Sequence, residues 1–310
     1  MVSALPARVT ILLCTYNGAA YLIQQLNSFL EQSHPHWSLW ISDDGSDDAT
    51  LEVLRAFQRD HGDARDIRLI EGPQQGNAAL NFMQLLCHPE LPAGYVALSD
   101  QDDIWLPFKL ERALRHLEGR PGAQVYAARS IHIDDTGARV GAARMHRGLP
   151  VLETAMMQNF LAGNTMVFNP QGLALVRAGG VPQGIGHHDW WLTLLFMASG
   201  GSVVLDSEPV LLYRQHARNV LGASSGLRAG LRRLRKVFSR EYGDWMIANA
   251  RALQDAAPAS PAARDIAAQF ISAPRRAGLL RPLLLWRLGL HRQSRTQTLF
   301  LYVMALLGRV

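Results

Sequence analysis

Short apolar runs alternate with amphipathic stretches through the first 120 residues. Apolar runs of strand length occur at residues 9–14, 37–42, 67–70 and 95–99, and helical patterns fall between them at 19–32, 49–60, 77–86 and 108–117. Runs without polar alternation are typical of strands that are buried on both faces. Strands that alternate with helices predict an α/β fold, in which helices flank a mostly parallel, Rossmann-like sheet.

The middle third of the chain is less regular. Strand pieces are predicted at 124–128 and 131–133, next to a turn at 134–137, and again at 162–168, 202–205 and 210–214. A glycine-rich stretch at 179–186 leads into an apolar helix that ends near residue 198. The small residues at 222–226 suggest a boundary, so we predict one domain over residues 1–222 and a helical C-terminal region over 223–310.

Composition narrows the class of protein. The chain has 310 residues, of which 48% are apolar and 18% charged, as in a globular protein. Two cysteines exclude a disulfide framework. No uncharged apolar run reaches the length of a membrane-spanning helix, and the first residues lack the pattern of a signal peptide. We therefore expect neither a conventional transmembrane helix nor export by a signal peptide.

Charge is divided unevenly along the chain. Residues 224–310 carry 15 Lys and Arg against 4 Asp and Glu, a balance of +11, whereas the rest of the chain stands at −6. Between residues 227 and 240, arginines alternate with leucines at helical spacing. This pattern, supported by the apolar runs at 283–288 and 299–304, suits an anionic membrane surface, and equally a solvated helix that packs on the protein. Aromatic side chains do not follow the basic stripe, so nucleic acid is not an expected partner.

Polar residues follow three of the predicted strands. Thr15, Tyr16 and Asn17 come after the first, Asp43-Asp44-Gly45-Ser46 after the second, and Asp100-Gln101-Asp102-Asp103 after the fourth. Ligands of parallel sheets bind at the carboxyl ends of the strands. Clustered carboxylates favour Mg²⁺ or Mn²⁺ held together with phosphates. The alternatives are a solvated acidic turn and an Asp-Gly turn that caps a helix. The common glycine-rich nucleotide fingerprints do not occur.

The order of five motifs resembles family 2 glycosyltransferases, and within them the bacterial rhamnosyltransferase type. The motifs are Thr15-Tyr-Asn17, Asp43-Asp-Gly-Ser46, Ser99-Asp-Gln-Asp-Asp-Ile-Trp105, His188-Asp-Trp-Trp191 and Tyr213-Arg-Gln-His216. The resemblance covers roughly residues 9–222. It implies a GT-A fold and an inverting, metal-dependent enzyme whose first-choice donor is dTDP-L-rhamnose. The acceptor would be a surface polysaccharide or a lipid-linked oligosaccharide, and the enzyme would be cytoplasmic and peripheral at the inner membrane face.

Two alternatives to this function stay open. One is the same fold acting on another UDP- or dTDP-hexose. The other is a non-catalytic protein that binds sugar nucleotides as a scaffold of polysaccharide assembly.

The resemblance also implies roles for individual residues. Asp44 would accept a hydrogen bond from the pyrimidine N3–H, and Asp102 would ligate the metal. His216 is a further metal or phosphate contact or, alternatively, a surface histidine at a strand end. An imidazole ligand suits Mn²⁺ better than Mg²⁺. The full set expected around the donor is Thr15, Tyr16, Asn17, Asp44, Gly76, Asn77, Asn81, Asp100 and Gln101.

On the acceptor side, the resemblance makes Asp189 the catalytic base, which removes the proton of the attacking hydroxyl. Trp190 and Trp191 would wall the sugar, or would belong to the core, as tryptophans in apolar helices often do. His188 would contact the acceptor or tune Asp189. Asn164 lies where the family lines its acceptor cleft.

Overall fold

The computed structural model describes residues 7–143, 148–216 and 240–310. Their contacts divide them into two compact units. The first contains the described residues of Met1–Met145, Leu161–Val181 and Gly201–His216. The second contains those of His146–Phe160, Pro182–Gly200 and Ala217–Val310. The second unit therefore includes two segments from the middle of the chain. The boundary predicted near residue 222 lies outside the described residues, as does the basic stripe at 227–240 apart from Arg240.

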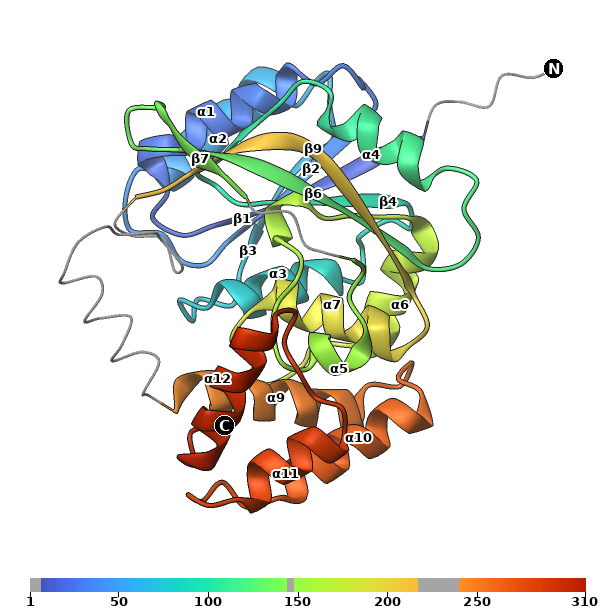
Figure 1. Cartoon of the computed structure of the whole chain (residues 1–310). Helices are drawn as coiled ribbons and strands as arrows, with labels where there is room; N and C mark the ends of the chain where they lie inside the picture. Colours follow the sequence, from blue (N-terminus) through green and yellow to red (C-terminus); the bar gives the residue numbers. More distant parts are fainter. Residues whose placement is uncertain (1–6, 144–147, 217–239) are drawn as a thin grey trace. The chain divides into compact units, whose positions relative to one another are not determined.

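A mixed sheet forms the centre of the first unit (Figure 1). Its strand order is β3-β2-β1-β4-β8-β6-β9-β5, with β7 beside β6. Neighbours β3, β2, β1 and β4 are parallel, as are β6 and β9, whereas β8 runs antiparallel to β4 and β6. The predicted, mostly parallel sheet is confirmed. The strands are β1 Val9–Thr15, β2 Trp37–Asp43, β3 Ile67–Glu71, β4 Tyr95–Ser99, β5 Ile104–Trp105, β6 Gln124–Ile133, β7 Arg139–Ala142, β8 Val167–Phe168 and β9 Ser202–Arg214.

Helices cover both faces of this sheet (Figure 1). One face lies under α1 (Ala19–Leu30), α2 (Thr50–His61) and α4 (Lys109–Leu117), and the other under α3 (Ala78–Leu86) and α6 (Pro170–Gly179). Alternate residues of β1 share these faces: Ile11 and Leu13 join the core cluster that contains Phe29 of α1 and Leu110 of α4. Every residue of β1 and β2 is buried, which is why both strands read as unbroken apolar runs.

Three strand predictions need correction. The pieces at 124–128 and 131–133 are one strand, β6, and the pieces at 202–205 and 210–214 are one strand, β9. The polar residues in between fall where the β6–β9 register shifts, so the ladder continues past them through bulges. Residues 162–168 are not one strand: a 3₁₀ turn, η1 (Gly163–Thr165), precedes β8. The Thr165 hydroxyl donates to the Ala162 carbonyl and closes that turn.

The described part of the second unit is helical. It contains α5 (Leu152–Ala155), α7 (His188–Ala198), α9 (Glu241–Asp255), α10 (Pro261–Ser272), α11 (Leu280–Arg287) and α12 (Arg295–Leu306). Ser260 caps α10 and Ser294 caps α12, each by accepting a backbone hydrogen bond. Trp190 and Trp191 on α7 are buried, as are Leu253 on α9 and Phe270 on α10, so the unit has a core of its own.

Candidate active site

The three predicted polar strand ends lie next to one another in the sheet. Thr15 at the end of β1 pairs with Asp43 at the end of β2, and Leu13 pairs with Ser99 at the end of β4. Burial, followed by the charges of Asp100 and Asp44, raises the pKa of the Cys14 thiol well above its usual value. The parallel pairing of β1 with β2 and β4 places these loops at one edge of the sheet.

Hydrogen bonds tie the β1 and β2 loops together. The Thr15 hydroxyl donates to Asp43 Oδ2 at 2.7 Å, and Asp43 also accepts from the hydroxyl and the amide of Ser46. Asn17 adopts a φ of 48°, which asparagine tolerates better than most residues. Its amide donates to Ser46 Oγ, and its side-chain oxygen accepts from the Asp47 amide. Asp43, the first residue of the Asp43-Asp44 pair, therefore connects the β1 and β2 loops through its side-chain hydrogen bonds.

Gln101 fastens the β4 loop to β1. Its Oε1 accepts from the Tyr16 amide and its Nε2 donates to the Tyr16 carbonyl, both at 2.9 Å. A Cβ at Gly18 would lie 2.1 Å from Gln101 Oε1, so only glycine leaves room for this clamp. Tyr16 itself is 49% exposed. The backbone of Tyr16 is therefore fixed by Gln101, whereas its side chain is accessible to a ligand.

Asp44 is buried and holds the loop that follows β3. Its two carboxylate oxygens accept from the amides of Gln75, at 3.0 Å, and Asn77, at 2.8 Å. Gly76, between them, has a φ of 61°. Asn77 caps α3 by accepting from the Leu80 amide. The residues predicted around the base, namely Asp44, Gly76 and Asn77, are therefore brought together.

Asn81 is placed differently. It is buried, its Oδ1 accepts from the Ser42 hydroxyl, and its Nδ2 donates to the Ser42 carbonyl at 3.1 Å. These bonds fasten α3 to β2. Asn81 therefore has a structural role in attaching α3 to β2. Its contact with the donor stays a prediction.

Asp102 and His216, the two predicted metal ligands, lie next to each other. His216 Nε2 lies 2.8 Å from Asp102 Oδ2. The pairing of Ile104 on β5 with Leu212 on β9 brings the two segments side by side. The His216 ring also stacks on Tyr21, with ring centroids 5.2 Å apart. Both side chains keep some solvent access, 19% for Asp102 and 12% for His216, so the pair is reachable by a ligand.

A buried polar network lies behind this pair, and of its members the sequence had suggested a role only for Asn164. Asp103 Oδ2 accepts from Asn164 Nδ2 at 2.6 Å, and the Asn164 carbonyl accepts from Lys109 Nζ at 2.5 Å. Burial, followed by the charges of Asp102 and Asp100, raises the pKa of Asp103. Burial also lowers the pKa of Lys109. Asn164, predicted on the acceptor side, is buried inside this network, a placement that favours a structural role.

Arg214 is a further residue beside this pair for which the sequence predicted no role. Its buried guanidinium donates to the carbonyls of Asp102, Asp134 and Asp135 and to Gln24 Oε1. It thereby fixes the backbone at Asp102. Its position two residues before His216, in the motif Tyr213-Arg-Gln-His216, was the only signal in the sequence.

The second unit carries the predicted base. Asp189 lies in the first turn of α7, and its Oδ1 accepts from the Trp190 amide at 2.8 Å. Burial lowers the pKa of His188 to about 4, so its imidazole is neutral at pH 7. Trp190 and Trp191 are buried, and Trp190 Nε1 donates to the Ala155 carbonyl. This burial favours the core interpretation of the two tryptophans over a sugar-facing wall.

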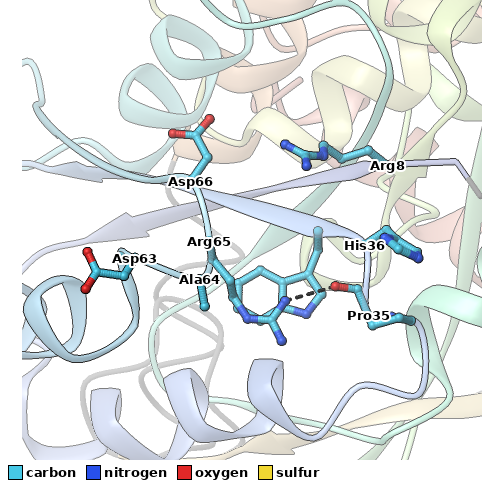
Figure 2. A pocket seen from close by; sticks show the side chains of 9 residues that line it. Arg8, Pro35, His36, Asp63, Ala64, Arg65 and Asp66 are labelled. Carbon is cyan, nitrogen blue, oxygen red and sulfur yellow. Dashed lines mark hydrogen bonds between the residues drawn. The ribbon is translucent and has the colours of Figure 1, made fainter.

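A depression of about 320 Å³ lies elsewhere on the first unit (Figure 2). It is lined by residues at the starts of β1, β2 and β3, opposite the strand ends that carry the carboxylates. The Arg65 guanidinium lies 3.9 Å over the Trp37 ring and donates to the Pro35 carbonyl. None of the predicted site residues lines it, and we assign it no role in the activity.

Comparison with known proteins defines the class. Residues 10–179 match the model of "Glycosyl transferase family 2". The chain is 30% identical over 251 residues to "dTDP-rhamnosyl transferase RfbG" of Shigella flexneri, an alignment that covers 78% of this chain and 85% of that protein.

Solved structures agree with this class. TarS of S. aureus in complex with UDP-GlcNAc aligns with a TM-score of 0.58 and 14% identity, over 85% of this chain and 71% of that chain. The mannosyltransferase PcManGT of Pyrobaculum calidifontis, in complex with GDP-Man and Mn²⁺, aligns with a TM-score of 0.54 and 21% identity, over 97% and 86%. The fold is that of GT-A glycosyltransferases, as predicted. The chain belongs to glycosyltransferase family 2.

Proposed function

We propose that this protein is an inverting glycosyltransferase that uses dTDP-L-rhamnose and transfers the sugar to a hydroxyl of a surface polysaccharide or lipid-linked oligosaccharide. The observation that carries the proposal is the set of cross-tied loops at the ends of β1, β2 and β4, which presents Tyr16, Asp44 and Asp102 at one edge of the sheet. The relative named as a dTDP-rhamnosyl transferase supports the choice of donor. The enzyme would work in the cytoplasm, in peripheral contact with the inner membrane face.

The nucleotide would bind between Tyr16 and the loop at residues 75–77. A carboxylate offers about four acceptor positions, so Asp44 retains capacity after accepting the amides of Gln75 and Asn77. It can therefore accept the N3–H of thymine or uracil. The exposed Tyr16 ring offers an aromatic face to the base or ribose.

Asp102 and His216 fit a divalent cation. Across residues 7–143, 148–216 and 240–310, no group of three or more His, Cys, Asp or Glu side chains converges to hold a metal by itself. Two protein donors are enough for Mg²⁺ or Mn²⁺ when phosphate and water complete the coordination. The imidazole favours Mn²⁺. When bound, such an ion neutralises the charge that develops on the leaving diphosphate.

The transfer itself needs one base. As the acceptor hydroxyl attacks the anomeric carbon, the Asp189 carboxylate takes its proton, and the bond from that carbon to the diphosphate oxygen breaks. Attack from the side opposite the leaving group inverts the anomeric configuration. A helix N-terminus stabilises the ionised form that a base requires. His188, neutral at pH 7, does not compete as a charged donor.

A donor screen tests the proposal. The full chain is incubated with Mn²⁺ and with dTDP-rhamnose, UDP-hexoses or GDP-mannose, and its melting temperature is recorded. A ligand that binds only the folded state adds about 2.7 kcal/mol of stability at a hundredfold excess over Kd. We expect the largest shift with dTDP-rhamnose, and release of dTDP when a saccharide acceptor is added. Stabilisation without transfer or hydrolysis of any donor would instead identify a non-catalytic scaffold.

A further inference from the structure

The last two helices of the second unit carry large apolar side chains on two sides. Leu285 of α11 and Leu301 of α12 are buried. On the outer sides, Leu280 is 72% exposed, Trp286 68% and Leu299 65%. A helix that is apolar all round is normally covered on both sides. Within residues 7–143, 148–216 and 240–310, nothing covers the outer sides of α11 and α12, although their composition calls for cover.

The exposed side chains form one stripe on each helix. They recur at steps of three and four residues, which places them on one side of each helix. The stripes meet at one end, because the Gly278 amide donates to the Leu306 carbonyl at 2.8 Å and Ala277 bridges to Leu307. We call the joint stripe the α11–α12 surface. It consists of Leu279, Leu280, Leu283, Trp286, Leu299, Phe300, Val303, Leu306 and Leu307.

The charge around this surface is of one sign. Residues 266–310 contain seven arginines and no Asp or Glu. Arg276, Arg287 and Arg295 are exposed and stand at the ends of the stripes. An apolar face with a cationic rim is complementary to anionic lipid. The leucines would contact the acyl chains, and the arginines would bind the anionic headgroups. A second copy of the same surface would bring arginines against arginines, with no carboxylate from this segment to pair them.

The geometry favours lying on a bilayer over crossing it. Among the described residues, no helix is both long enough and apolar enough to span a membrane. A helix of the length of α12 extends about 18 Å, against about 30 Å for the hydrocarbon core. Trp286, exposed on α11, has the amphipathic ring that is enriched at membrane interfaces.

We propose that the α11–α12 surface docks the protein on an anionic lipid bilayer. This surface contains residues of the apolar runs at 283–288 and 299–304 and is distinct in sequence from the basic stripe at 227–240. Docking needs neither a sugar donor nor Asp189. A failure of the lipid test would therefore leave the proposed transferase activity untouched, and a failure of the transferase test would leave the proposed docking untouched.

Vesicle flotation of the full chain tests the docking site. We expect binding to phosphatidylcholine vesicles that contain phosphatidylglycerol, weaker binding to phosphatidylcholine alone, and loss of binding as salt rises. Leu283→Ser combined with Trp286→Ser should lower the partition constant at least about tenfold. Val140→Ser is the matched control, because Val140 is 55% exposed on β7 in the first unit.

Charge variants test the cationic rim separately. Arg287→Gln and Arg295→Gln should each lower binding to anionic vesicles by roughly fivefold at low salt. Arg139→Gln, which removes an exposed arginine from β7, should change it little. Far-UV circular dichroism confirms that each variant is folded.

Trp286 also supplies a direct readout. It is 68% exposed, whereas Trp245 is half-buried and the other five tryptophans are buried. Anionic vesicles should shift its fluorescence to the blue and protect it from iodide. The response should vanish in Trp286→Phe while flotation persists.

Wild-type binding by the Leu283→Ser/Trp286→Ser variant would overturn the proposal. So would a wild-type protein that ignores anionic vesicles but forms a dimer that this variant dissociates, since the surface would then belong to a second copy.

Discussion

The imidazole of His216 lies 2.8 Å from the carboxylate of Asp102, although the two residues are 114 positions apart in the chain. The β5–β9 pairing and the anchoring of the Asp102 carbonyl by Arg214 hold this pair at the sheet edge. Under the proposed function, this carboxylate and this imidazole would be the two protein ligands of one divalent cation.

Asp102→Asn should therefore abolish most of the metal-dependent affinity for dTDP. An amide is a poor metal ligand compared with a carboxylate, and the backbone contact with Arg214 is retained. Calorimetric titration of dTDP with and without Mn²⁺ measures the effect. Asp63→Asn is the control, since Asp63 is an exposed carboxylate at the opposite end of the sheet, in the depression of Figure 2. Unchanged Mn²⁺-dependent affinity in Asp102→Asn would show that the metal binds elsewhere.

The nucleotide site should prefer thymine and uracil over cytosine. Asp44 can accept the N3–H of the first two bases, whereas N3 of cytosine carries no hydrogen. A buried acceptor that faces another acceptor costs about 1–3 kcal/mol, or roughly 5- to 150-fold in affinity. Competition of dTDP, UDP and CDP for the wild-type protein in Mn²⁺ measures this. Equal affinities for the three would remove Asp44 from the base site.

A third prediction concerns acid stability of the first unit. Burial alone would raise the pKa of Asp206, but bonds from Arg112, the Glu208 amide and Tyr126 outweigh burial and lower the pKa to about 2. Because the folded pKa lies below the unfolded value of about 3.9, the carboxylate stabilises the fold at neutral pH by about 2 kcal/mol. This contribution disappears as the pH falls from about 5 toward 2.

Asp206→Asn should thus lower the melting temperature at pH 7 and have a shrinking effect toward pH 3. Glu208→Gln, an exposed carboxylate on the same strand, is the control. A difference between wild type and Asp206→Asn that stays constant with pH would mean that the Arg112 bonds do not depend on ionisation of Asp206.

The polar edge of the sheet could be predicted from the sequence because local signals coincide there. Buried parallel strands read as apolar runs, and the polar residues that follow them must gather at one edge of the sheet. The partners of those residues could not be predicted. Asn81 is predicted near the base, but its bonds to Ser42, which fasten α3 to β2, could not be predicted. Such bonds join residues distant in sequence, and no local pattern encodes them.

The same limit explains the buried network behind Asp102. A lysine at the start of an amphipathic helix predicts a solvated side chain, yet Lys109 is buried, with its ammonium 3.3 Å from the centroid of the Trp105 ring. Tertiary packing overrides the local pattern there. In the C-terminal region the sequence predicted helices, but nothing in it showed that α9 packs against α7.

That packing gives a fourth prediction. Trp245 of α9 rests on the loop before Asp189: a Cβ at Gly186 would lie 2.4 Å from its ring, and His187 packs edge-on at 4.5 Å. If Asp189 is the base, as proposed, Trp245 acts as a positioning residue for it. Trp245→Ala should lower kcat about tenfold and leave the KM for the donor unchanged, because a small misplacement of a reacting group is costly. Trp245→Phe should restore most of the rate. Equal losses in both variants, or a rise in donor KM, would contradict this role.

The last prediction is that loss of Asp189 separates binding from chemistry. Proton removal by a placed base contributes about 10²–10⁴-fold to a rate. Asp189→Asn should lower transfer by that order and leave dTDP affinity nearly unchanged, since the amide oxygen can still accept from the Trp190 amide. Asp255→Asn, an exposed carboxylate at the end of α9, is the matched control.

The rival interpretation makes Asp189 only a stabiliser of the α7 N-terminus. His187 occupies the N-cap position without a side-chain cap, so Asp189 is the acidic residue of that first turn. In that role Asn would cost at most about 1 kcal/mol of stability and little activity, because only the interaction of the charge with the helix dipole is lost. The two interpretations therefore differ by at least two orders of magnitude in turnover. Near-wild-type turnover by Asp189→Asn, with donor and acceptor saturating, would place the base elsewhere.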